Sequence, residues 1–224
     1  MVVVVVKART TMHTYSLSYV FLNITGNNTF DEKLGALGYK VPKLVGEAAS
    51  EILERSGRSS FHFALDAGCG TGLAGCFLRP LVNGPLVGVD HSKKMLELAS
   101  KCTTEHGCGL KEAGGEYRKD DGASDESKRL YDHLAALDLE TTTLNELLGE
   151  TDKPDHDGFD LIVAADVLVY FGDIKNLLIN FAKLSATNRS ALIFSCERIG
   201  DEDAPDSGWK LQSSGRYAHS KSYF

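Results

Sequence analysis

Short apolar runs and longer apolar stripes alternate along the chain between residues 41 and 196. The short runs have the length of buried strands, and they predict strands at 61–66, 86–90, 131–137, 159–165 and 191–196. Apolar residues three and four positions apart predict intervening helices that begin near residues 41, 73, 92, 144 and 173. Because parallel strands need crossover connections, this alternation predicts an α/β fold: a doubly wound, Rossmann-like and mostly parallel sheet flanked by helices.

The last predicted strand, 191–196, has the continuous apolar run of an interior strand. The segment 209–212 is short and the remaining tail is polar, so the pattern predicts no strand to cover its outer edge. A bare apolar edge readily pairs with another chain. We therefore expect self-association through this edge, seen as poor solubility or as a dimer.

Two stretches interrupt the alternation. Residues 1–29 are predicted to be a leader, disordered or mis-assigned, ahead of a single domain over residues 30–224. The first 30 residues include Lys7 and Arg9 but no acidic residue, which weakly resembles an organelle transit peptide. Residues 105–129 mix glycines with charges of both signs, and we expect a mobile loop there.

Composition limits the classes of function. A chain of 224 residues, 42% of them hydrophobic, fits one globular domain. The formal net charge of −7 argues against general nucleic-acid binding, which needs a basic surface. Five cysteines without a C-x-x-C pair indicate a reducing compartment, which we expect to be the cytoplasm, or an organelle if a transit peptide is present. The apolar run 2–6 is too short to span a membrane. With nucleic acid and membrane both disfavoured, the expected partner is a small molecule or a protein.

A glycine-rich segment, Asp66-Ala67-Gly68-Cys69-Gly70-Thr71-Gly72, follows the first predicted strand. Ligands of open parallel sheets bind beyond the carboxyl ends of the strands, and glycines let the backbone approach them closely. The spacing is G-x-G-x-G, with Leu73 where a dinucleotide-binding turn has its third glycine. Asp66 would repel a pyrophosphate and favour a cationic ligand such as a sulfonium amino acid. The alternative is a tight glycine turn with a capping aspartate.

Acidic residues follow the next three strands. Asp90 comes 22 positions after Gly68, near the separation at which a carboxylate accepts hydrogen bonds from ribose hydroxyls. A helix-capping turn is the alternative. Asp138 and Leu139 are placed to bind an adenine amino group and cover the ring, or they form an ordinary strand end. Asp166 is placed for the methionine part of a ligand or for the substrate.

These segments resemble the class I S-adenosylmethionine-dependent methyltransferases over residues 61–196. LDAGCGTG resembles the first motif of that family, LVGVDHSKKMLELA its acidic second-strand motif, and FDLIVAADVLVYFGDI its fourth-strand motif. The resemblance implies methyl transfer with S-adenosylmethionine as cofactor. The residues that it places at the cofactor are Asp66, Gly68, Cys69, Gly70, Gly72, Asp90, His91, Asp138, Leu139 and Asp166.

Three segments are similar to predicted methyltransferases that are often fused to tetratricopeptide repeats: FDEKLGALGYKVPKLV, AADVLVYFGD and SGRYAHSKSY. That subgroup usually has an aromatic and acidic lid segment before FDEKL, where this chain reads LNITGNNT. The seven-stranded family sheet ends in a hairpin after the SGRYAHS segment. The resemblance therefore implies that the last two strands are missing and that the chain is a truncated, alternative or mispredicted product of a gene for the full enzyme.

Methyl transfer by in-line displacement depends on alignment and removal of water more than on strong acids or bases. A hydroxyl or protonated amine acceptor would still need a base, and His219 is the candidate catalytic residue. The alternative for His219 is a histidine in solvent or in a structural hydrogen bond. The Asn/Asp-Pro-Pro-aromatic motif of many amide and base amino-methyltransferases is absent from the sequence, so DNA adenine methylation is not expected. Together with the acidic net charge, this leaves no nucleic-acid acceptor expected. No metal is expected either, since the cysteine spacing does not support a zinc ribbon.

Two other functions stay open. A nicotinamide-dependent dehydrogenase would share the glycine turn and the ribose-binding carboxylate, although Leu73 and Asp66 argue against it. A non-catalytic cofactor-binding or assembly protein derived from a methyltransferase would keep the pocket and act through a partner surface.

Overall fold

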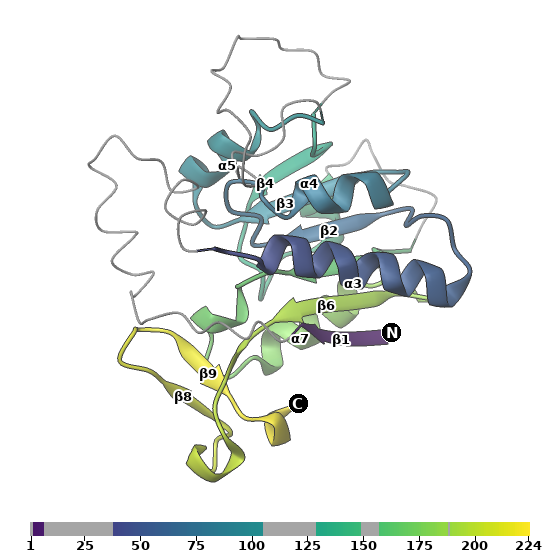
Figure 1. The fold of residues 1–224 in the computed structure, drawn as a ribbon. Helices are drawn as coiled ribbons and strands as arrows, with labels where there is room; N and C mark the ends of the chain where they lie inside the picture. Colours follow the sequence, from purple (N-terminus) through teal and green to yellow (C-terminus); the bar gives the residue numbers. More distant parts are fainter. Residues whose placement is uncertain (1, 7–37, 105–128, 149–156, 188) are drawn as a thin grey trace.

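The computed structural model describes residues 2–6, 38–104, 129–148, 157–187 and 189–224 (Figure 1). At its centre is a six-stranded sheet in the order β1-β6-β5-β2-β3-β4, in which all neighbouring strands pair in parallel. The strands are β1 (Val2–Val6), β2 (Ala64–Ala67), β3 (Leu86–Asp90), β4 (His133–Ala136), β5 (Leu161–Ala164) and β6 (Ala191–Ser195). The predicted parallel α/β fold is confirmed, with all five expected strands.

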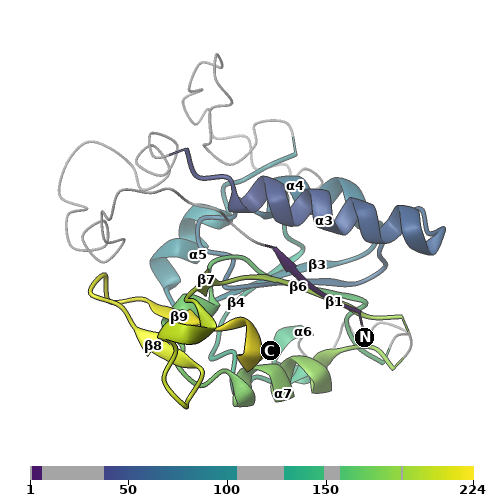
Figure 2. The same cartoon turned by 60° about the horizontal axis from the view of Figure 1, so that its bottom comes forward.

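Helices cover both faces of the sheet (Figure 2). One face is covered by α3 (Val41–Ser56), α4 (Gly75–Leu78) and α5 (Lys93–Ala99). The other face is covered by α6 (Leu144–Leu148) and α7 (Lys175–Leu184). This arrangement gives the sheet two hydrophobic cores, one on each side.

The central strands are buried on both faces, as their continuous apolar runs predict. In β5, Leu161 and Val163 pack into the core on the α3 side, while Ile162 and Ala164 pack into the core on the α7 side. Full burial of a large aliphatic side chain stabilises a fold by about 1.5–3 kcal/mol. Successive strand residues point to opposite faces, so one short strand stabilises both layers of helices.

The predicted helix after residue 73 is shorter than its pattern indicates. Only α4, Gly75–Leu78, is α-helical, and a 3₁₀ turn, Arg79–Leu81, follows it. Pro80 has no backbone N–H to donate, which disfavours continuation of the α-helix. The Arg79 guanidinium donates instead to the carbonyls of Val82 and Gly84, each at 2.6 Å, and closes this end of the helix.

The expectation of an exposed strand edge is wrong. Strand β6 pairs with β5 on one side and with β1 on the other, in a parallel register from Val2 opposite Ala191 to Val6 opposite Ser195. Five consecutive β-branched residues favour an extended strand, so this part of the predicted leader belongs to the sheet. The expected self-association through a bare β6 edge therefore loses its basis.

The tail after β6, whose pattern predicts no strand able to cover the β6 edge, forms a second, small sheet. Its strands are β7 (Glu197–Arg198), β8 (Trp209–Leu211) and β9 (Tyr217–His219), in the order β7-β9-β8. The Trp209 ring lies so close to Gly172 that a Cβ there would be 2.6 Å away from it. This contact holds the small sheet against the segment that follows β5.

Two of the predicted segments lie largely outside the described residues: positions 7–29 of the leader and positions 105–128 of the loop. Within the ranges that the structure does describe, no helix has the length and apolar character needed to cross a membrane.

Candidate functional site

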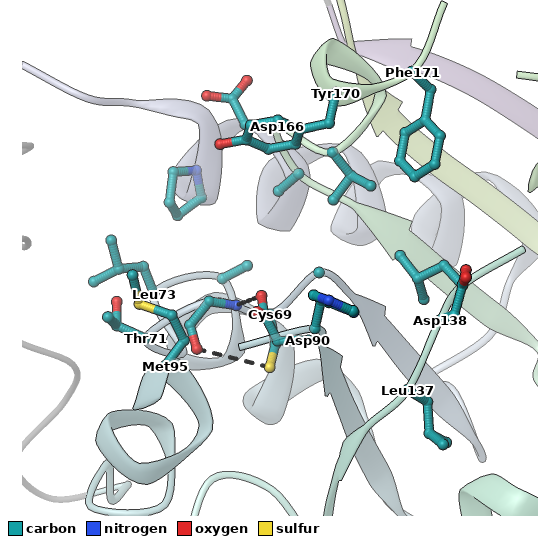
Figure 3. Close-up of a pocket in the computed structure, with 18 of the residues that line it drawn as sticks. Cys69, Thr71, Leu73, Asp90, Met95, Leu137, Asp138, Asp166, Tyr170 and Phe171 are labelled. Atoms are coloured by element: carbon teal, nitrogen blue, oxygen red, sulfur yellow. Dashed lines mark hydrogen bonds between the residues drawn. The ribbon is translucent and has the colours of Figure 1, made fainter. Parts of the chain in front are cut away.

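A cavity of about 410 Å³ lies at the carboxyl ends of β2, β3, β4 and β5 (Figure 3). Its walls come from the segments that follow these strands, 68–71, 90–91, 137–140 and 165–167. Residues from other elements complete the lining: Tyr39, Pro42, Leu73, Ala74, Met95, Tyr170, Phe171 and Arg216. Ligands of open parallel sheets bind in this position, so the cavity is the candidate functional site.

The glycine turn forms one side of the cavity. Gly68 and Gly70 have φ angles of 76° and 55°, in the left-handed region that disfavours other residues. A Cβ on Gly68 would lie 2.3 Å from Cγ2 of Val167, whereas a Cβ on Gly70 would meet nothing within 4 Å. Gly68 therefore permits close contact between the segments after β2 and β5, while Gly70 leaves open space next to the cavity.

Asp90 joins this turn to the end of β3. Its Oδ2 accepts a hydrogen bond from the Gly70 N–H at 3.0 Å, and its Oδ1 accepts one from the Ser92 N–H at 2.8 Å. Both oxygens keep further acceptor capacity, because each carboxylate oxygen has two lone pairs. Asp90 and His91 both line the cavity, so a carboxylate is available to a ligand there.

Asp66 lies behind the turn rather than in the cavity wall. Its carboxyl group is fully buried, and Oδ2 accepts a 2.6 Å hydrogen bond from the Tyr131 hydroxyl. Burial raises the pKa of Asp66 to about 7; the Tyr131 hydrogen bond opposes this rise and the nearby Asp90 charge adds to it. Gly72 also lies away from the cavity, next to Tyr131 and Cys102. Any effect of Asp66 on a ligand would pass through the turn.

Another wall is formed by residues 137–140, after β4. Leu139 is buried and lines the cavity together with Asp138, whose Oδ1 accepts from the Glu140 N–H at 2.8 Å. Asn180 on α7 fixes this segment by donating to the Leu139 carbonyl at 2.9 Å. Figure 3 shows Leu137 and Asp138 on the same side of the cavity, separated from Met95. Leu137 and Leu139 alternate here with two carboxylates, Asp138 and Glu140, and this mixture of apolar and polar groups suits a flat, partly polar ring.

Asp166 is held by partners from three other parts of the chain. Its φ of 57° is unusual for a residue with a side chain. The Ser195 hydroxyl accepts from the Asp166 N–H at 2.7 Å and donates to Oδ1 at 3.1 Å. Arg216 lies 3.5 Å from Oδ2, and Tyr39 hydrogen-bonds the carboxylate. Burial, followed by the charge of Asp166, raises the pKa of Tyr39 well above its usual value. Strained residues with this much support often occur at functional sites.

His219, the predicted catalytic base, does not line the cavity. It is buried, and its Nε2 lies 2.9 Å from the Gly172 carbonyl oxygen. Its ring packs near Tyr223 and Phe224, and burial lowers its pKa. Arg216, just before β9, lines the cavity instead. The pairing of β9 with β7 and β8 thus gives His219 a structural position, which is the alternative considered for it.

Sequence patterns did not identify several lining residues. Tyr39 lies just before α3, Met95 is in α5, Tyr170 follows β5, and Arg216 precedes β9. Tyr39, Tyr170 and Arg216 each belong to one of the three segments that resemble the repeat-fused methyltransferases. That resemblance was the one sequence signal that could have grouped them.

A family model described as "Methyltransferase domain" matches residues 65–188, more than half of the chain. The chain belongs to this methyltransferase family. The matched segment includes the glycine turn, Asp90, Asp138 and Asp166, but ends before the small sheet that carries Arg216. No curated protein matches the sequence.

Solved methyltransferases share the fold. The magnesium protoporphyrin IX methyltransferase ChlM from Synechocystis, solved with bound S-adenosylmethionine, is 15% identical, with a TM-score of 0.51 over 93% of this chain and 76% of that chain. A SAM-dependent methyltransferase from Leishmania major is 16% identical, with a TM-score of 0.52 over 87% of this chain and 63% of that chain. The chain spans 53% of the YcgJ protein from Bacillus, so it covers between 53% and 76% of the length of these three proteins.

The cofactor of this methyltransferase family is S-adenosylmethionine, and the cavity residues fit it. The volume of about 410 Å³ lies in the range of ligand cavities, roughly 300–1,000 Å³. Open space at Gly70 leaves room for a ligand against the turn. The carboxylates of Asp90, Asp138 and Asp166 suit a cofactor whose sulfonium and ammonium outweigh its single carboxylate.

Proposed function

We propose that this chain transfers a methyl group from S-adenosylmethionine, bound beyond β2 and β3, to an acceptor that enters beside Asp166. The observation that supports this most directly is the hydrogen bond from the Gly70 N–H to the Asp90 carboxylate, between two residues of the cavity wall. A carboxylate beside the turn favours ribose hydroxyls and a cationic ligand. A nicotinamide-binding fold can have the same carboxylate, and it is Leu73, at the position of the third glycine of a dinucleotide-binding turn, that argues against NAD.

Each part of the cofactor has a proposed partner. Asp90 accepts hydrogen bonds from the ribose hydroxyls, with His91 beside it. Leu139 covers the adenine ring, and Asp138 accepts from its amino group. The backbone at 68–70 lies along the methionyl part, where glycines allow close contact.

When bound, S-adenosylmethionine supplies a methyl group activated by the adjacent sulfonium. The proposed task of the chain is to orient the acceptor and to exclude water. Tyr39, Tyr170 and Phe171 line the side of the cavity next to Asp166 and supply apolar surface for this purpose. Asp166, fixed by Ser195, lies on this side of the cavity and is placed for the methionyl part of the cofactor, next to the incoming acceptor.

The acceptor is proposed to be a small molecule or a protein side chain. We also propose membership of the subgroup often fused to tetratricopeptide repeats, since all three segments that carry this resemblance contribute residues to one cavity. The five cysteines of the sequence include no C-x-x-C pair, which favours a reducing compartment, proposed to be the cytoplasm.

Isothermal titration with S-adenosylhomocysteine and NAD tests the cofactor assignment. We expect S-adenosylhomocysteine to bind and NAD not to bind. Asp90→Ala should weaken S-adenosylhomocysteine binding by about 2–4 kcal/mol, because two ribose hydroxyls lose a charged acceptor. Glu97→Ala on the exposed side of α5 is the matched control and should leave the affinity unchanged. Binding of NAD in its place would favour the dehydrogenase, and unchanged affinity in folded Asp90→Ala would remove Asp90 from the site.

Incubation with methyl-labelled S-adenosylmethionine and a cell extract tests the transfer itself. We expect label in either the small-molecule or the protein fraction, with loss of this label in Asp90→Ala. Binding of the cofactor without any transfer would favour the non-catalytic cofactor-binding protein.

A further inference from the structure

The cavity wall combines several acidic residues with a single permanent positive charge. Asp90, Asp138, Glu140 and Asp166 line it, and among the lining residues that the structure describes Arg216 is the only arginine or lysine. S-adenosylmethionine carries two positive groups and one carboxylate. The carboxylate therefore has one cationic partner available in this cavity, whereas the ammonium and sulfonium have several acidic ones.

Neighbouring carboxylates hold Arg216 in place without using all of its donors. Its Nη2 lies 3.5 Å from Asp166 Oδ2, and its Nε forms an ion pair with Glu197 Oε1. The side chain is only 9% exposed, and Nη1 is buried without a hydrogen-bond partner. A buried donor without a partner is costly, so an acceptor oxygen of a ligand would be stabilising there.

Arg216 lies at the end of the cavity where the methionyl part is expected. Arg216 forms an ion pair with Asp166. Val167, which follows Asp166 in the sequence, packs directly on Gly68 of the glycine turn. Figure 3 shows Asp166 and Tyr170 across the cavity from Asp90. The amino-acid end of the cofactor extends from the ribose, so it would pass from Asp90 along the turn toward Asp166 and Arg216.

We propose that Arg216 binds the carboxylate of the methionyl part of S-adenosylmethionine, while Asp166 binds its ammonium group. This assignment rests on the proposed function. The pair of opposite charges on the protein matches the pair on the ligand. Because Arg216 lies outside the segment matched by the family model, 65–188, this contact comes from the small tail sheet and not from the family's shared motifs.

Two ligands that share the adenosine and the thioether test the assignment by calorimetry. S-adenosylhomocysteine has the amino-acid end, and 5′-methylthioadenosine lacks it. Arg216→Gln should weaken S-adenosylhomocysteine binding about 10- to 100-fold and change 5′-methylthioadenosine binding less than about twofold. Arg216→Lys keeps the charge and should fall between wild type and Arg216→Gln. Lys210→Gln, at an exposed position of β8, is the control and should change neither affinity.

The two ligands also separate this assignment from the proposed function. Equal losses for both ligands in Arg216→Gln, or an unchanged S-adenosylhomocysteine affinity, would overturn the role of Arg216 while wild-type binding still supports the cofactor site. A wild-type chain that binds neither ligand would overturn the proposed function itself. If Arg216→Gln fails to fold, the wild-type protein is titrated with S-adenosylmethionine and with decarboxylated S-adenosylmethionine. We expect the decarboxylated ligand to bind at least about 10-fold more weakly. Equal affinity for those two ligands would overturn the assignment.

Discussion

Alanine substitutions at Gly68 and Gly70 separate two roles within one turn. Both glycines have left-handed φ angles, 76° and 55°, so alanine strains the backbone at both. A Cβ would lie 2.3 Å from Val167 at position 68 but would meet nothing within 4 Å at position 70. The pair therefore compares backbone strain alone with strain plus steric overlap.

The expected magnitudes follow from these contacts. A residue with a Cβ in the left-handed conformation costs about 1–2 kcal/mol, and overpacking a core contact adds about 1–3 kcal/mol. We expect Gly68→Ala to lower the free energy of unfolding by about 2–5 kcal/mol and Gly70→Ala by about 1–2 kcal/mol. For a chain of this length each kcal/mol corresponds to about 2–4 °C in melting temperature.

Thermal unfolding and titration with S-adenosylhomocysteine measure the two effects. Gly70→Ala should stay folded yet lose at least about tenfold in affinity, because its methyl group enters space that the ligand needs. Val167→Ala removes Cγ2, with which the new methyl group would overlap. Adding Gly68→Ala to Val167→Ala should therefore lower the free energy of unfolding by less than adding Gly68→Ala to the wild type does. Equal melting temperatures for the two glycine variants, together with no recovery in the double variant, would refute this explanation of the turn.

Two further predictions concern buried polar groups. The pKa of Asp66 is raised from 3.8 to about 7, so the folded protein holds a proton that the unfolded chain releases. The free energy of unfolding should fall as pH rises from 3.8 to about 7. Asp66→Asn should flatten this dependence in melting experiments, and an identical slope in both proteins would contradict the shift. His219→Ala should lower the melting temperature, because Gly172 loses its hydrogen-bond partner, but leave S-adenosylhomocysteine affinity unchanged. A selective loss of affinity would contradict the placement of His219 outside the cavity.

The sheet and the glycine turn could be predicted because their signals are local. A strand buried on both faces needs a continuous apolar run, and 159–165 and 191–196 have one. The spacing of Gly68, Gly70 and Asp90 reflects the βαβ unit that contains them. The hydrogen bond from Gly70 to Asp90 is the structural counterpart of that spacing. The sequence alone therefore indicated the fold, the sheet edge that carries the site and the main candidate carboxylate.

Contacts between distant segments depended on the tertiary structure. The run Val2–Val6 is compatible with a leader or a strand, and only its pairing with β6 decides between them. Asp66 is next to the turn in sequence, but burial behind it and the Tyr131 hydrogen bond separate it from the cavity. Pattern and propensity describe neighbours along the chain, whereas burial and pairing depend on what packs against each segment.

The tail illustrates the same limit at the candidate site. Arg216 and His219 stand three positions apart in one polar segment, and nothing in their spacing tells which of them lines the cavity. The small sheet β7-β9-β8 makes that distinction by bringing Arg216 to Asp166 and His219 to the Gly172 carbonyl. The chemistry of each side chain was readable from the sequence, but its partner was decided by strand pairing after β6, because that pairing determines which groups each side chain can reach.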